Sequence, residues 1–150
     1  MKYPLVVVIA SMLSFGLAGC GDSSPLSGGA LTAAEAPLPD EWTAVAADNV
    51  VQLETNPDDP YSVNLWVIGQ GPNLYVYRGT SDATWVDNIK ANPAVRIQIG
   101  ESVYALRAER VEDDAEFSTF ADAWESKYGS DRPQETNPAD AYLYRLVPRS

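Results

Sequence analysis

The 150-residue sequence contains no histidine and a single cysteine, Cys20. Without histidine the chain cannot use a Ser-His-Asp triad or a histidine general base, and it lacks the commonest ligand of transition metals. One cysteine excludes an intramolecular disulfide, an Fe–S cluster and a cysteine-based zinc site. Both methionines, Met1 and Met12, lie close to the N-terminus. The sequence therefore predicts no metal site, and it identifies no catalytic residue.

Positive charge is also scarce. Ten Lys and Arg stand against 21 Asp and Glu, which gives a formal net charge of −11. Such an acidic surface argues against nucleic acid as a partner and against electrostatic binding to anionic lipid. Two acidic clusters, Asp58-Asp59 and Glu112-Asp113-Asp114, lack the spacing of a calcium-binding loop. We interpret the first as a solvated turn and the second as the N-terminus of a helix.

The N-terminus has the features of an export signal. Lys2 supplies a positive start, and Pro4 to Leu13 form an apolar run that is short for a transmembrane helix. The sequence Leu17-Ala18-Gly19-Cys20 resembles a bacterial lipobox, in which the cysteine is lipidated and becomes the new N-terminus. The alternatives are a plain secretory signal or an uncleaved anchor.

Segment boundaries follow from this interpretation. Residues 1–19 are predicted to be a lipoprotein signal peptide, residues 20–39 a flexible tether rich in Ser, Gly, Ala and Pro, and residues 40–150 one folded domain. Acylated Cys20 would hold this domain on a lipid bilayer of the bacterial cell envelope, facing the periplasm. Gly21 is not the Asp that retains lipoproteins in the inner membrane, which favours the outer membrane in a Gram-negative cell.

The domain alternates strand-like and helix-like patterns. Period-two apolar spacing predicts six strands, over Val50–Thr55, Tyr61–Ile68, Leu74–Tyr77, Val95–Ile99, Ser102–Val111 and Ala141–Val147. Helical spacing predicts a short helix that begins at Asp40, a second from Asp82 to Asn92, and a third from Asp113 or Asp114 to Tyr128. Six strands with marginal helices indicate a mainly β fold, a six-stranded antiparallel barrel.

The loop after the third strand, Arg78-Gly79-Thr80-Ser81, carries a fixed positive charge and two hydroxyls directly before a helix. A helix N-terminus with such neighbours can bind an anion. It is equally an ordinary way for the chain to change direction.

The residues from Glu41 to Pro148 resemble the split β-barrel proteins, which include the FMN-binding pyridoxamine-phosphate-oxidase-like proteins and the deazaflavin-dependent nitroreductases. The most specific part of the resemblance is the spacing of Trp85, Asn88, Asn92, Pro93 and Val95. A small uncharacterised branch beside the nitroreductases is the most similar group.

This resemblance implies a flavin or deazaflavin phosphate at the barrel flank, often at a homodimer interface. Arg78, Thr80 and Ser81 match the loop that holds phosphate or ribityl oxygens in the family. Trp85 falls where the helix packs beside the ligand cleft, and Lys90 lies on that helix. Hydride chemistry would then belong to FMN or a deazaflavin, with the protein orienting it.

One segment departs from the family pattern. Nitroreductase relatives carry a basic loop between the first two strands, where this chain has Asn56-Pro57-Asp58-Asp59-Pro60. A unit charge at 4 Å changes an interaction by about 1 kcal/mol in water and by several in a partly buried cleft. Two functions therefore stand: a lipid-anchored barrel that binds a small molecule or partner and has lost cofactor use, or a flavin- or deazaflavin-dependent oxidoreductase of nitro or quinone reductase type.

Overall fold

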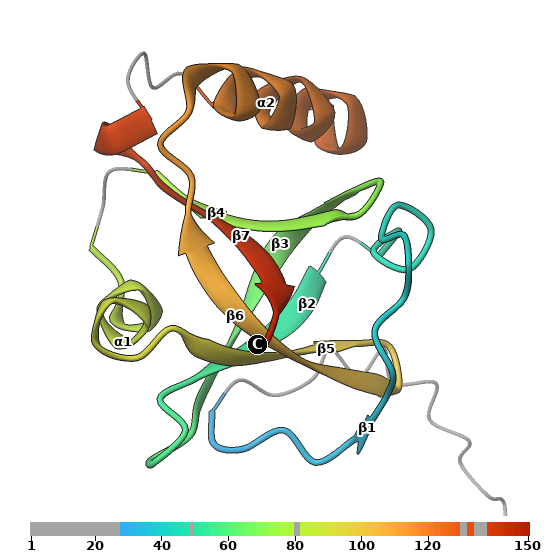
Figure 1. The fold of residues 1–150 in the computed structure, drawn as a ribbon, viewed down its shortest axis with the longest axis vertical. Helices are drawn as coiled ribbons and strands as arrows, with labels where there is room; N and C mark the ends of the chain where they lie inside the picture. The colour runs from blue at the N-terminus through green and yellow to red at the C-terminus, as the bar shows by residue number, and fades with distance from the viewer. Residues whose placement is uncertain (1–27, 49, 80–81, 130–131, 134–137) are drawn as a thin grey trace, which may run out of the picture.

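The computed structural model describes residues 28–48, 50–79, 82–129, 132–133 and 138–150 (Figure 1). The predictions for Cys20, Thr80 and Ser81, and with them the signal peptide, lie outside these residues. No helix within the described ranges is long and apolar enough to cross a membrane. The same ranges contain no group of three or more side chains suited to hold a metal ion.

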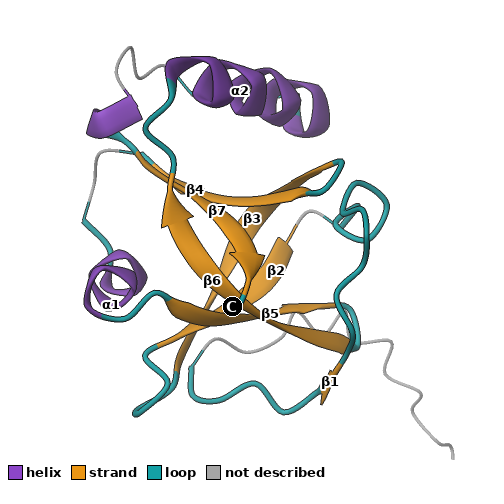
Figure 2. Cartoon of the chain, in the orientation of Figure 1, coloured by secondary structure: helices purple, strands orange, loops and turns teal. Residues whose placement is uncertain are grey.

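The described residues form a closed six-stranded antiparallel barrel with one extra short strand (Figure 2). The strands are β1 (Ala34–Glu35), β2 (Val50–Thr55), β3 (Tyr61–Gln70), β4 (Asn73–Arg78), β5 (Ala94–Ile99), β6 (Ser102–Arg110) and β7 (Tyr142–Pro148). Their order is β1-β6-β5-β2-β3-β4-β7, and a further pairing of β6 with β7 closes the barrel. The prediction of a mainly β, six-stranded barrel is confirmed.

Two long strands make closure possible because each changes partner along its length. In β3 the first residues pair with β2 as far as Trp66, and Val67 to Gln70 pair with β4. In β6 one edge pairs with β5, while the other pairs with β1 at Ser102 and Val103 and with β7 from Leu106 onward. A strand that leaves one neighbour for another turns the corner of a barrel without ending.

The barrel interior is filled by alternating apolar side chains. Leu53, Val76 and Ile97 are fully buried in this cluster. Helix α1 (Thr84–Ala91) adds Trp85, Val86 and Ile89 to the same cluster. We call the place where this helix meets the end of β4, the end of β6 and the start of β7 the α1 end of the barrel.

Helix α2 (Asp114–Tyr128) covers the outer face of β3, β4 and β7 and encloses a second core, which contains Phe117, Phe120 and Trp124 (Figure 1). The side chain of Asp113 accepts a hydrogen bond from the Glu116 N–H at 2.8 Å, so it caps the helix as predicted. Gly129 ends it in the left-handed conformation, φ 58°. Tyr75 and Tyr77 lie beneath this helix.

The prediction of a short helix that begins at Asp40 is wrong. The chain makes one turn there, in which the Ala46 N–H donates to the carbonyl oxygen of Trp42 at 2.8 Å. The Trp42 N–H donates to the carbonyl oxygen of Gly71 at 2.7 Å, and this hydrogen bond attaches the turn to the β3–β4 hairpin. Gly69 permits this approach, since a Cβ there would lie 2.3 Å from the Trp42 oxygen. Trp42 is buried against Tyr104.

The described part of the predicted tether lies against the barrel. Leu31 is buried, and its N–H donates to Glu54 at 2.6 Å. The Ala36 N–H donates to Val103 at 2.8 Å, next to the parallel pairing of β1. Composition gave no sign of this contact, because a two-residue strand has no periodicity to detect. A 3-10 turn (η1, Pro138–Asp140) leads into β7.

Candidate anion site at the α1 end

The residues that carry the family resemblance have structural contacts. Trp85 is buried with its ring edge-on to Tyr144, centroids 5.9 Å apart. The Asn88 amide donates to the Thr55 hydroxyl at 3.0 Å, and the Asn92 side chain accepts from the Ala94 N–H at 3.0 Å. Pro93 offers its carbonyl to Ala108 at 2.8 Å. This motif therefore fixes α1 and β5 on the barrel.

Helix α1 begins without a side-chain cap. Its N-cap residue is Ala83, which has extended backbone and no side-chain oxygen. The carbonyl of Ala83 accepts from Val86 and Asp87, but the first N–H groups of the helix have no capping side chain. A helix start of this kind keeps backbone donors and a partial positive charge available for an anion.

Arg78, the last residue of β4, is exposed at this place. It pairs across the sheet with Tyr142, so both side chains lie on the pleat face that continues to Val76 in the interior. Within the described ranges Arg78 has no hydrogen-bond or ion-pair partner, whereas every other described Lys and Arg donates to a carboxylate or a carbonyl. Its guanidinium is the available cation at the α1 end.

Two further cations contact the ring of Tyr142. The Lys90 ammonium lies 4.6 Å from the ring centroid, and the Arg110 guanidinium carbon lies 4.8 Å from it. Arg110 also lies 5.7 Å from the Tyr144 ring. Each such contact is worth about 0.5–1 kcal/mol at an exposed position. In a chain of net charge −11, Tyr142 thus has two cations at its ring and a third, Arg78, as its cross-strand partner.

Arg110 is held by the chain that leads into β7. Its Nη2 donates to the carbonyl of Ala139 at 3.1 Å and to that of Ala141. Its Nε is buried and has no hydrogen-bond partner within the described residues. An unpaired donor on a cation costs free energy unless an acceptor is supplied. The donor set at this end, Arg78, Lys90 and Arg110, therefore fits a phosphate group.

Carboxylates also lie near this place and set a limit on its positive potential. Asp87 accepts from Lys90 at 3.3 Å, in a pair with both side chains largely exposed. Partial desolvation acts to lower the pKa of Lys90, but Asp87 and Tyr142 together raise it above its ordinary value. The ammonium thus stays charged at neutral pH. Such an exposed pair contributes little to stability, so Lys90 can exchange Asp87 for another anion.

The structure brings together Arg78 and Lys90 from the predicted cofactor-binding set, and it buries Trp85. Thr80 and Ser81 lie outside the described residues, and all five assignments stay predictions. Arg110 and Tyr142 were missed. Arg110 follows Tyr104, Leu106 and Ala108 at even spacing on the inward face of β6, so the alternation of that strand contained the signal that places it at this end.

The acidic turn Asn56–Pro60 follows β2, whose last residue, Thr55, accepts a hydrogen bond from Asn88 of α1. Asp58 and Asp59 are exposed, while Pro57 and Pro60 line a cavity with Arg96 and Arg149. No contact between this turn and Arg78 is found in the described part of the chain. The turn is closed by local hydrogen bonds, in which the Asn56 side chain donates to the Asp59 carbonyl at 2.9 Å.

Comparison with known proteins agrees with this architecture. A pyridoxamine 5'-phosphate oxidase from Listeria innocua shares 20% identity over 71% of this chain and 90% of its own, with a TM-score of 0.56. A protein described as a domain-swapped dimer shares 16% identity over 65% of this chain and 79% of its own, with a TM-score of 0.53. An F420-H2 dependent reductase (16%, 65% and 93%) has a TM-score of 0.52.

The chain has the split β-barrel fold of these proteins. The family model for F420H(2)-dependent quinone reductase matches residues 77–138 of this split-barrel protein. That match spans Arg78, Lys90 and Arg110. No curated protein gives a significant match to the sequence.

Proposed function

We propose that this split-barrel protein is an oxidoreductase that uses a flavin or deazaflavin, and that the phosphate of this cofactor binds at the α1 end. The observation that supports it best is Arg78, a cation without a partner among the described residues, beside an uncapped helix start. The family match over residues 77–138 names an F420H(2)-dependent reductase, which favours a deazaflavin over FMN.

The protein's own part in such a reaction is binding and orientation. The Arg78 guanidinium would pair with phosphate oxygens as a planar fork, and Lys90 would add a point charge. Arg110 would add positive charge and support the ring of Tyr142. The buried Trp85 and Tyr144 would keep this end rigid. When bound, the cofactor itself supplies hydride transfer, which explains how a chain without histidine could be an enzyme.

A titration of the purified domain with FMN and with F420 tests the proposal. We expect binding of at least one of them, and we expect Arg78→Ala to weaken it about tenfold or more, because a hydrogen bond to a charged group contributes about 1.5–3 kcal/mol. Arg132→Ala is the matched control, since Arg132 pairs with Asp122 on α2, at the opposite side of the barrel. If calorimetry shows binding of neither cofactor, the result would favour the alternative function, a barrel that has lost cofactor use.

The envelope location is part of the proposal. Cys20 would be acylated, and the domain would face the periplasm from a membrane of the cell envelope, which in a Gram-negative cell would be the outer membrane. Cells labelled with a fatty-acid analogue should incorporate it into the full chain and not into Cys20→Ser. Label on the variant, or none on the wild type, would contradict a lipid anchor.

A homodimer is proposed as well, because one protein of this fold is a domain-swapped dimer. In the monomer Trp66 is 43% exposed beside Val50, its cross-strand partner, which is 45% exposed. Sedimentation of the wild type and of Trp66→Ser would show whether a dimer forms and whether this surface holds it.

A further inference from the structure

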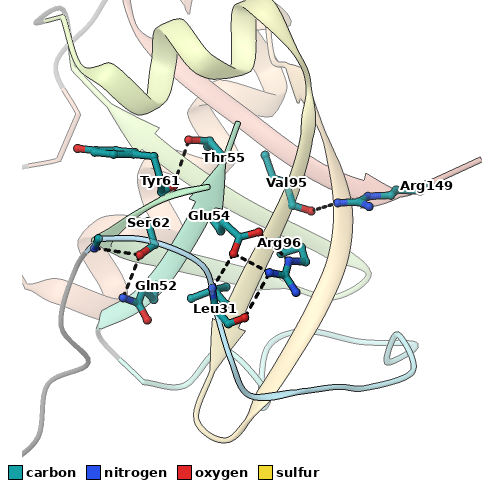
Figure 3. Close-up of polar contacts among 10 residues, drawn as sticks. Leu31, Gln52, Glu54, Thr55, Tyr61, Ser62, Val95, Arg96 and Arg149 are labelled. Atoms are coloured by element: carbon teal, nitrogen blue, oxygen red, sulfur yellow. Dashed lines mark hydrogen bonds and ion pairs between the residues drawn. The ribbon is translucent and has the colours of Figure 1, made fainter. Parts of the chain in front are cut away.

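A second group of charges lies on the outer side of the barrel wall, away from the Arg78 group. A cavity of about 180 Å³ opens between the β2–β3 turn, the start of β5 and the C-terminal residues (Figure 3). Pro57 and Pro60 line one side of it, and Arg96 and Arg149 line the other. Arg96 lies on the opposite pleat face from Val95 and Ile97, which are buried in the interior.

Arg149 is held in place by neutral groups only. Its Nε donates to the carbonyl of Leu106 at 3.0 Å, and its Nη2 donates to that of Val95 at 2.7 Å (Figure 3). Within the described ranges it forms no ion pair. Two strand carbonyls therefore fix the orientation of a guanidinium whose charge no carboxylate neutralises by contact, and its Nη1 has no partner there.

Arg96 has a carboxylate partner, Glu54, but both oxygens of this carboxylate already accept hydrogen bonds. Arg96 donates through Nε and Nη2 to the two oxygens of Glu54, both at 2.7 Å. The second Glu54 oxygen also accepts from Leu31 N–H at 2.6 Å, and the side chain of Glu54 is only 6% exposed. Burial would raise the pKa of Glu54, but Arg96 and the Leu31 N–H lower it below the ordinary value. Among the side chains that line the cavity, two guanidiniums and one carboxylate leave one formal positive charge.

We infer that this cavity is a binding site for a small oxyanion, a phosphate or carboxylate group, with Arg149 as its main donor and Arg96 Nη1 as the second. Planar guanidiniums with fixed orientation suit such groups. Pro57 and Pro60 bring no charge and no backbone N–H to their side of the cavity. Asp58 and Asp59 lie on the same turn but do not line the cavity, so they weaken the site without blocking it. The inference does not depend on the proposed cofactor.

NMR of the wild-type domain provides the direct test. Inorganic phosphate and acetate are added separately, with chloride at equal ionic strength as the reference, and the Nε–H signals of Arg96 and Arg149 are followed. We expect saturable shifts of both signals with at least one oxyanion beyond those in chloride. Shifts equal to those in chloride would overturn the inference. Because the measurement uses the wild-type domain, it does not depend on whether a variant folds.

A variant then assigns the site. Arg149→Gln should weaken oxyanion binding about tenfold, because one charged donor is lost. Arg132→Gln, which removes the same charge from a residue that pairs with Asp122 of α2, should leave the affinity unchanged. Equal affinity in wild type and Arg149→Gln, or equal loss in both variants, would contradict a local site. Binding of FMN or F420 measured in parallel separates this site from the α1 end.

Discussion

The two helices of this barrel differ in how completely their polar groups are used. Helix α2 has a side-chain cap at Asp113, a glycine at its end, and a network beneath it in which Tyr75 donates to Glu116 at 2.9 Å and Arg145 donates to the same carboxylate at 2.8 Å. Helix α1 starts at an alanine, and Arg78 beside it has no partner within the described ranges. Helix α2, whose polar groups are paired, stabilises the fold, whereas α1 leaves hydrogen-bond donors for a ligand.

The substitution with the largest expected effect on stability is Phe120→Ala. Phe120 is fully buried between α2 and the sheet and contacts Tyr75, Tyr77 and Trp124. Its removal should lower the free energy of unfolding by about 3–5 kcal/mol. Urea denaturation measures it. Glu125→Ala, at an exposed position of the same helix, should change it by no more than about 0.5 kcal/mol. A loss for Phe120→Ala as small as in this control would mean that α2 contributes little to the fold.

Tyr75→Phe tests the polar network under α2. Burial raises the pKa of the Tyr75 hydroxyl above its ordinary value of 10.0, and the hydrogen bond to Glu116 raises it further. A raised pKa stabilises the fold fully below the ordinary value, and this contribution is lost as the pH rises beyond about 10. Tyr75→Phe should cost about 1 kcal/mol at neutral pH. Denaturation from pH 8 to 11 should show a shallower alkaline decline in the variant, and parallel declines would contradict the linkage.

Exchanging the caps sharpens the comparison. Asp113→Ala removes the α2 cap and should cost about 1 kcal/mol of unfolding free energy. Ala83→Asp adds a cap to α1, whose extended N-cap backbone suits it, and should gain up to about 1 kcal/mol. The same change should weaken cofactor binding, because its carboxylate occupies the free donors. Thermal denaturation and calorimetry measure the two effects, and a gain in both would contradict an anion site there.

The smallest expected effect on stability is that of Arg78→Ala. Because Arg78 is exposed and contacts no described partner, its loss should change the free energy of unfolding by no more than about 0.5 kcal/mol. Urea denaturation of this variant beside Arg145→Ala checks it. Arg145 pairs with Glu109 and Glu116, and its loss should cost more. Equal losses would mean that Arg78 has a structural role.

Much of the barrel could be predicted because its strands alternate cleanly. The period-two spacing of Val95, Ile97 and Ile99 and the helical stripe from Phe117 to Trp124 gave the correct elements, with ends shifted by one or two residues. The turn after Asp40 was mistaken for a helix because its fastening to Gly71 is a long-range backbone contact. Arg110 and Tyr142 meet only because β6 pairs with β7, and a pairing between distant strands leaves no local pattern.

The same limit applied to Glu54. A carboxylate in the middle of Val-Val-Gln-Leu-Glu-Thr looks like an outward, solvated residue, yet Leu31 and Arg96 bury it. Its partners lie 23 and 42 residues away. Local periodicity could not show that another segment covers the face on which Glu54 lies.

The short strand β1 has a consequence for how this protein behaves in solution. Strand β6 pairs with β7 only from Leu106 onward, so its first residues would otherwise present unsatisfied backbone groups along an open edge. Such edges recruit strands from other molecules and start aggregation. Ala34 and Glu35 occupy that edge with a segment of the same chain. Two residues outside the barrel thereby protect this incomplete seam against intermolecular pairing.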